Sequence, residues 1–241
     1  MPDLAEVLKV LSFQAGYNTA VVVLGALLLG VAAGTIGCFA VLRRRALIGD
    51  ALAHSALPGI CIAFLIAPSF GFESKSIFFL LAGAAFSGLL GVLSVQLLSR
   101  ETRLQEDAAI GIVLSVFFGI GVTLLSVIQS LPSTQAAGLS RFIYGQTASM
   151  QFNDALALAV MAGIVVCLTA LFSKEFRLLC FDPEFAQSLG WSTRLLDVIL
   201  LVMLTTVTII GLQSVGILLV VALLIIPATA ARFWTERLRS M

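Results

Sequence analysis

The two residues best suited to chemistry in this sequence are Asp50 and His54, in the stretch RRRALIGDALAHSALPG. His54 is the only histidine of the chain. Residues four apart share one helix face, so this carboxylate and imidazole can reach a single cation. Such an oxygen and nitrogen pair suits Mn, Fe(II), Zn or Co. Two ligands do not close a site, but a symmetric dimer meeting on this face would supply two Asp and two His.

A structural interpretation of the same pair stays open. Asp50 follows Gly49 and fits the N-cap position of a helix, and His54 would then be hydrogen-bonded to a neighbouring helix. Against this interpretation, ionisable groups inside apolar spans are costly and tend to mark ion pathways. Pro58, one turn after His54, would free a backbone carbonyl that adds a possible oxygen ligand.

The elements that must position this pair are membrane spans. Apolar residues make up 60% of the 241 residues and charged residues only 11%, whereas globular domains have about 25% charged residues. A run of about 20 apolar residues crosses a hydrocarbon core of roughly 30 Å. Seven such runs occur, at residues 18–42, 51–70, 77–98, 108–129, 152–172, 195–212 and 215–231. We therefore predict an all-α, polytopic membrane protein with residues 18–232 as its transmembrane domain.

The last two apolar runs leave an alternative open. They are short, and only Gln213 and Ser214 separate them. They could therefore form a re-entrant pair that never fully crosses the bilayer, since irregular backbone lined by protein is tolerated at membrane depth.

Basic residues indicate the orientation, because Lys and Arg accumulate on the cytoplasmic side of membrane proteins. Seven spans leave only Lys9, Lys75 and Arg141 on one side and place the other basic residues opposite them. This excess predicts an external N-terminus and a cytoplasmic tail at residues 233–241. Residues 1–17 lack the features of a signal peptide and suit a retained, interfacial amphipathic helix.

The longest cytoplasmic connection, residues 173–194, carries the signals of a short helix. Asp182 suits the N-cap, and Pro183 suits the first helical position. Glu184 suits the positive end of the helix dipole, and Gly190 can end the helix. A helix over residues 183–189 would expose Phe185 and Leu189 on one face. This face either docks a partner or packs against the ends of the spans.

Several classes of function lack their sequence signals. No GxxxxGK(S/T) phosphate loop occurs, so a separate subunit would have to bind any ATP. The four cysteines form no CxxC pair, and the basic residues form no single patch that would indicate nucleic acid. We expect no enzymatic activity in this chain and no permanently bound cofactor.

Glu106 and Asp107 open the fourth span, where they suit a helix N-terminus.

Five segments, in the same order, resemble the membrane permease subunits of bacterial ABC importers for manganese, zinc and iron(II). These segments are RRRALIGDALAHSALPGICIAFLI, EDAAIGIVLSVFFGIGVTLLS, RFIYGQTASM, FDPEFAQSLGW and VGILLVVALLIIPATAAR. The resemblance extends over about residues 17 to 232. Members of this family usually continue with at least one further span, so we expect either a short paralogue or a truncated sequence.

The resemblance implies a site and a set of partners. Asp50 and His54 match the Asp and His along the metal pathway at the interface of two permeases. The coupling helix near residues 182–190 would seat in a groove of a cytoplasmic ABC ATPase. The remaining partners would be an extracytoplasmic metal-binding protein and a second permease, identical or different, in the bacterial plasma (inner) membrane. The transported ion would be Mn, Zn or Fe.

A self-sufficient secondary transporter coupled to an ion gradient is the alternative function. It predicts further buried acids at mid-membrane, and the spans are almost bare of them. An intramembrane enzyme would need a Ser/His pair or an HExxH motif, and neither is visible.

Overall fold

The computed structural model describes residues 16–235 apart from 44, 46, 72–75, 131–144, 146 and 148–149. Residues 1–15 of the predicted interfacial helix and residues 236–241 of the predicted tail lie outside these residues. Every regular element in the described part is helical.

The helices follow the apolar runs closely. They are α2 (Tyr17–Leu42), α3 (Ile48–Ile66), the 3-10 turn η1 (Ala67–Phe70), α4 (Ile77–Glu101), α5 (Glu106–Ser130), α7 (Phe152–Leu171), α8 (Ser173–Phe181), α9 (Pro183–Ser188), α10 (Thr193–Val215) and α11 (Ile217–Trp234). Seven of them are long and apolar enough to cross a membrane, and each predicted end lies within three residues of the observed one. Helices form here because a span must satisfy its backbone hydrogen bonds internally.

Helices α10 and α11 take the place of the two short apolar runs. α10 has 23 residues and α11 has 18, so each has the length of a full span. The chain breaks between them at Gly216, whose φ of 83° and ψ of 172° are open almost only to glycine. A re-entrant pair is therefore not needed to account for this part of the chain.

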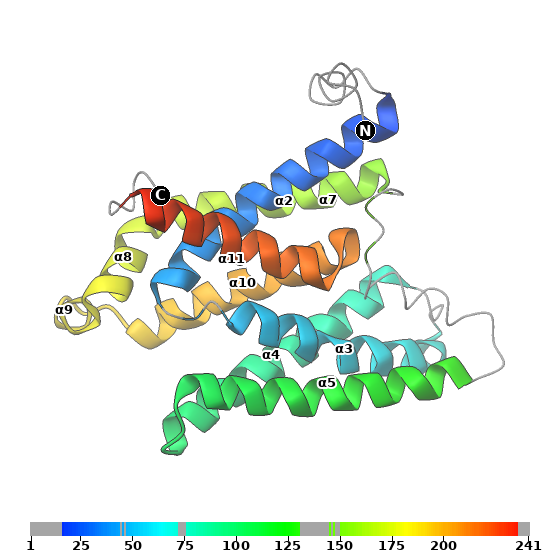
Figure 1. Ribbon diagram of the computed structural model, residues 1–241, viewed down its shortest axis with the longest axis horizontal. Coiled ribbons are helices and arrows are strands. Elements are labelled where there is room, and N and C mark those ends of the chain that lie inside the picture. Colours follow the sequence, from blue (N-terminus) through cyan, green and yellow to red (C-terminus); the bar gives the residue numbers. More distant parts are fainter. Residues whose placement is uncertain are drawn as a thin grey trace.

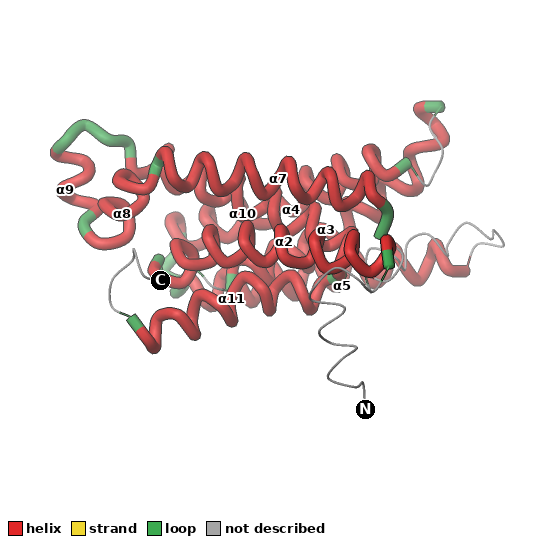
Figure 2. Tube along the Cα trace, turned by 90° about the horizontal axis from the view of Figure 1, so that it is seen from above, coloured by secondary structure: helices red, strands yellow, loops and turns green. Residues whose placement is uncertain are grey.

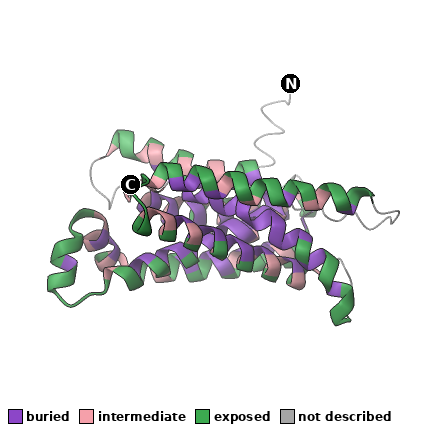
Figure 3. Cartoon of the chain, turned by 90° about the horizontal axis from the view of Figure 1, so that it is seen from below, coloured by how far each residue is buried: buried purple, intermediate pink, exposed green. Residues whose placement is uncertain are grey.

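The interior of the bundle is formed by α3 and α10. Helix α3 packs between α4 and α5, α2 packs on α7 and α11, and α10 contacts both groups (Figure 1). Buried residues fill the middle of the bundle, and the outward faces are exposed (Figure 3). These outward faces carry large apolar side chains such as Phe78, Phe86 and Leu97, as lipid-facing surfaces do.

Small residues allow α3 and α4 to lie in direct backbone contact. A Cβ atom added to Gly59 would collide with the carbonyl oxygen of Gly83, and one added to Gly83 would lie 2.6 Å from the Cβ of Ala63. The hydroxyl of Ser87 donates to the carbonyl of Ser55 at 2.6 Å across the same contact. Helix α3 is thus held tightly through close packing of small residues.

The two ends of the bundle differ. Helices α8 and α9 project from the end of the bundle at which α4 connects to α5 and α11 ends, whereas α2 begins at the opposite end (Figures 1 and 2). The arginine-bearing connections therefore gather at one end, as the charge count predicts. Which side of the membrane this end faces stays a prediction.

Candidate functional site

Helix α3 begins earlier than the sequence signals indicate. Its N-cap is Leu47, which makes no capping hydrogen bond, and Asp50 lies inside the first turn. The interpretation of Asp50 as the N-cap is therefore wrong. The carboxylate still lies in the first turn of α3, near the positive end of the helix dipole.

Asp50 and His54 are in contact on one face of α3. The imidazole Nε2 of His54 lies 3.4 Å from the carboxylate Oδ1 of Asp50, and the two side chains keep 23% and 36% of their surface exposed. Two ligand atoms, each about 2.1 Å from a tetrahedral metal ion, are roughly 3.4 Å apart. The pair is therefore spaced to hold one cation while staying accessible from outside the chain.

The surroundings of His54 do not explain it as a structural residue. Its ring packs edge-on against Phe118 of α5, with ring centroids 4.9 Å apart. Its Nδ1 atom is buried and has no hydrogen-bond partner among the described residues. A buried polar atom without a partner costs about 1–3 kcal/mol, so the hydrogen bond to a neighbouring helix that a structural role needs is missing here.

The described part of one copy of the chain does not bring together a complete set of metal ligands. Among the described residues, no group of three or more His, Cys, Asp and Glu side chains comes together. Pro58 lies inside α3 and has no N–H to donate to the carbonyl of His54, four residues earlier. That carbonyl therefore lacks its usual helical donor.

The short helix predicted over residues 183–189 is present as α9. The carboxylate of Asp182 accepts a hydrogen bond from the N–H of Phe185 at 2.9 Å, so Asp182 is its N-cap. Gly190 follows the helix with a φ of 86°. Phe185 and Leu189 are 50% and 55% exposed. The apolar face therefore points away from the spans and remains free to meet another molecule.

Helix α8 fixes α9 to the end of the bundle, and sequence reasoning missed it. Its residues Phe176 and Leu179 are fully buried. The ring of Phe176 lies 5.4 Å from that of Phe39 in α2. Burial raises the pKa of the Cys180 thiol to about 11, although the charge of Arg43 opposes the shift.

Four charged residues, called the ion cluster below, meet at the same end: Arg43, Arg45, Glu106 and Asp197. Asp197 belongs to α10, and its side chain is only 9% exposed. Sequence reasoning passed over Asp197. The signal that could have found it is an acid inside the apolar run at residues 195–212, where a charge needs a partner.

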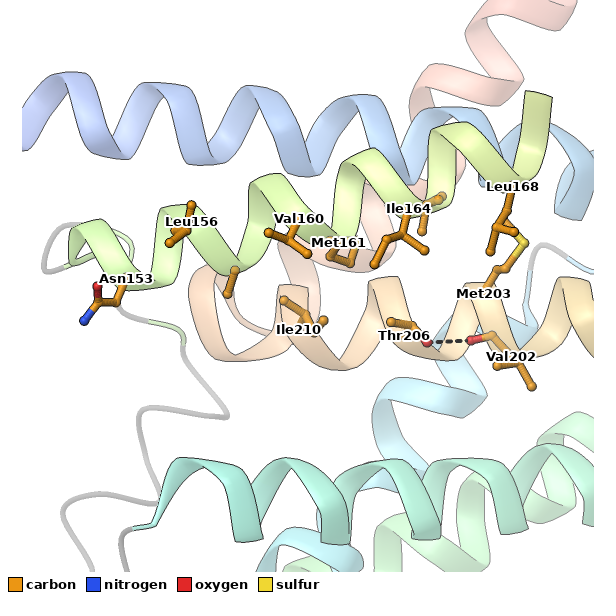
Figure 4. A pocket seen from close by; sticks show the side chains of 12 residues that line it. Asn153, Leu156, Val160, Met161, Ile164, Leu168, Val202, Met203, Thr206 and Ile210 are labelled. Atoms are coloured by element: carbon orange, nitrogen blue, oxygen red, sulfur yellow. Dashed lines mark hydrogen bonds between the residues drawn. The ribbon is translucent and has the colours of Figure 1, made fainter. Parts of the chain in front are cut away.

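An apolar groove of about 700 Å³ between α7 and α10 is unsuited to a cation (Figure 4). Its wall is formed by aliphatic side chains such as Val160, Ile164 and Ile210. The hydroxyl of Thr206 is used within its own helix, where it donates to the carbonyl of Val202 at 2.9 Å. Among the described residues, no acidic, basic or histidine side chain lines this groove, so the candidate metal site remains with α3.

Seven helices long and apolar enough to cross a membrane define a multi-pass membrane protein, in which Asp50 and His54 are in contact on one span and α9 projects at one end. The chain belongs to the ABC 3 transport family, which it matches over residues 17–241. This membership places it in the inner membrane.

Two curated relatives and one solved structure illustrate what this chain is similar to. The manganese transport system membrane protein MntC of Bacillus subtilis is 47% identical over 93% of the chain, and the chain spans 50% of that relative. The zinc transport system membrane protein TroC of Treponema pallidum is 44% identical over 92% of the chain, which spans 73% of it. PsaBC from Streptococcus pneumoniae, solved in complex with Fab, has a TM-score of 0.78 and 28% identity, over 97% of this chain and 79% of that one.

Proposed function

We propose that this chain is the translocation subunit of an ATP-driven importer of divalent transition metal ions, namely Mn, Zn or Fe. Family membership supports the transport class, and relatives named for manganese and zinc transport support the cargo. The observation that carries the proposal within the chain is the contact between Asp50 and His54 on α3.

The cargo would be bound transiently, between two copies of α3 or between α3 and a related permease. Asp50 and His54 supply an oxygen and a nitrogen ligand, and both side chains are partly exposed to a partner. A second permease would complete four ligands, the number that closes a tetrahedral site. Because the ligands would be shared between two copies, separation of the copies would release the ion.

The energy would come from a cytoplasmic ABC ATPase docked on α9. The chain has no phosphate-binding loop of its own. Helix α9 presents Phe185 and Leu189 at the end of the bundle where the arginine-bearing connections lie. By the positive-inside rule, this end is cytoplasmic. An extracytoplasmic metal-binding protein would then deliver the ion at the opposite end.

Uptake of radioactive or fluorescently detected Mn, Zn and Fe in proteoliposomes tests the metal site. The vesicles would hold this chain, its ATPase and its binding protein. Loss of even an indirect partner of a metal ligand costs about tenfold to a hundredfold in affinity or activity. Asp50→Ala and His54→Ala, which remove direct ligands, should therefore each lower the uptake rate by at least about tenfold. Asp107→Ala is the matched control, since Asp107 is an exposed acid that opens α5, and it should transport normally.

The comparison must be made on assembled complexes, which size-exclusion chromatography can verify. Wild-type rates in both pathway variants would show that Asp50 and His54 are not on the route of the ion. Wild-type vesicles that accumulate none of the three metals would contradict the proposed function as a whole.

A further inference from the structure

We propose that the ion cluster, Arg43, Arg45, Glu106 and Asp197, transmits the movement of α8 and α9 to the helix that carries the metal pair. Its members are positioning residues, since none lies on the Asp50 and His54 contact. The inference rests on the proposed function, in which α9 meets the ATPase and α3 holds the ion. It adds the physical connection between these two sites.

The connection starts at α8 with a backbone carbonyl that the sequence leaves unpaired. In a continuous helix, the carbonyl of Leu179 would accept from residue 183, but Pro183 has no N–H. The guanidinium of Arg43 takes its place, with Nη1 donating to this carbonyl at 2.9 Å. A cation is also favoured at the negative end of a helix. Leu179 lies in the last turn of α8, where carbonyls lack helical donors, so its carbonyl is available to Arg43.

The centre of the cluster is the nearly buried carboxylate of Asp197. Nη2 of Arg43 lies 2.9 Å from one carboxylate oxygen and 3.0 Å from the other. Nη1 of Arg45 lies 3.3 Å from the same carboxylate, as an electrostatic contact without hydrogen-bond geometry. One acid of α10 is therefore shared by the arginine that contacts α8 and the arginine that precedes α3.

Arg45 and Glu106 connect the ion cluster to α3, which carries Asp50 and His54, and to α5, which packs against α3. The carbonyl of Arg45 accepts a hydrogen bond at 3.1 Å from the N–H of Ile48, the first residue of α3. The guanidinium Nε of Arg45 lies 2.9 Å from Glu106, the first residue of α5. Helix α5 in turn carries Phe118, whose ring touches His54.

The cluster is suited to moving as a unit. Two positive and two negative groups balance within it, and Arg43, Arg45 and Asp197 keep 19%, 15% and 9% of their side chains exposed. Separation of such partners leaves a buried charge without compensation. A displacement of α8 by the ATPase is therefore passed to α10 and α3, because breaking the contacts costs more than moving the helices together.

Hydrogen exchange of the complex with its ATPase tests the connection without any need for transport. We would compare amide exchange in residues 48–54 and 183–189 before and after addition of a non-hydrolysable ATP analogue. In wild type, both segments should respond. In Arg43→Gln and Glu106→Gln, residues 183–189 should still respond, while the response of residues 48–54 should fall by about twofold to thirtyfold, the range for mutations along a coupled network.

Matched controls separate this inference from loss of folding. Glu106 is 36% exposed, so its replacement should leave the bundle folded, and Asp107→Asn changes an exposed neighbouring acid outside the cluster. Glu106→Gln should have no added effect in an Arg45→Gln background, because the two residues act through one contact.

Two results have different meanings. A wild-type response of residues 48–54 in both variants would overturn the role of the cluster alone. No response of residues 183–189 in wild type would instead overturn docking of the ATPase on α9, which belongs to the proposed function.

Discussion

At the scale of single residues, Asp182 determines whether α9 keeps its first turn. Its carboxylate caps the helix through the N–H of Phe185, and loss of such a cap costs about 1 kcal/mol. In Asp182→Ala, we expect faster amide exchange in α9 and weaker binding of the ATPase. Exchange measurements and a pull-down with purified ATPase would check this. Asp182→Asn keeps a capping oxygen and should behave like wild type, so an equal loss in both variants would contradict the capping explanation.

Asp197 is the residue whose removal should cost the most stability. It compensates two arginines inside the bundle, and breaking a buried ion pair costs about 3–5 kcal/mol. Asp197→Ala should therefore unfold at a clearly lower temperature in detergent. Asp107→Ala removes an exposed acid and should change stability by no more than about 0.5 kcal/mol. Similar melting temperatures for both variants would contradict the assignment of a buried, shared charge.

At the scale of elements, the contact between α3 and α4 depends on the lack of a side chain at Gly59. A methyl group there would meet the backbone of α4 at Gly83, and overpacking costs about 1–3 kcal/mol. Gly59→Ala should therefore lower the melting temperature and reduce uptake, because α3 carries Asp50 and His54.

Gly119→Ala provides the comparison for this packing effect. Nothing lies within 4 Å of the Cβ position at Gly119 in α5. Alanine favours a helix by about 1 kcal/mol over glycine, so this variant should be as stable as wild type or slightly more stable. If Gly59→Ala were equally harmless, the close approach of α3 and α4 would be wrong.

At the scale of the whole molecule, the uneven charge of the two ends predicts the orientation in the membrane. In a cysteine-free background, Ser188→Cys on α9 and Tyr17→Cys at the start of α2 place single, exposed thiols at opposite ends. An impermeant maleimide should label position 17 in intact spheroplasts and position 188 only in inside-out vesicles. The reverse pattern would show that the positive-inside rule fails for this chain.

The sequence by itself was sufficient to predict the seven spans and α9. Long apolar runs have only one way to satisfy their backbone in a bilayer, so the helices follow directly from composition. The N-cap Asp182 and the stop Gly190 are local signals, and they correctly predicted the position of α9. The spacing of Asp50 and His54 likewise follows from helix geometry.

Tertiary structure decided the features that join distant parts of the chain. Helix α8 was missed because a segment of 9 residues is too short to be a stable helix by itself, and it depends on packing such as that of Phe176 against Phe39 of α2. The start of α3 at Ile48 follows contacts of Arg45 rather than a capping side chain. Asp197 meets Arg43 across 154 positions. No local pattern encodes such a pairing, because the attraction between buried charges depends on their separation in space and not on their distance along the chain.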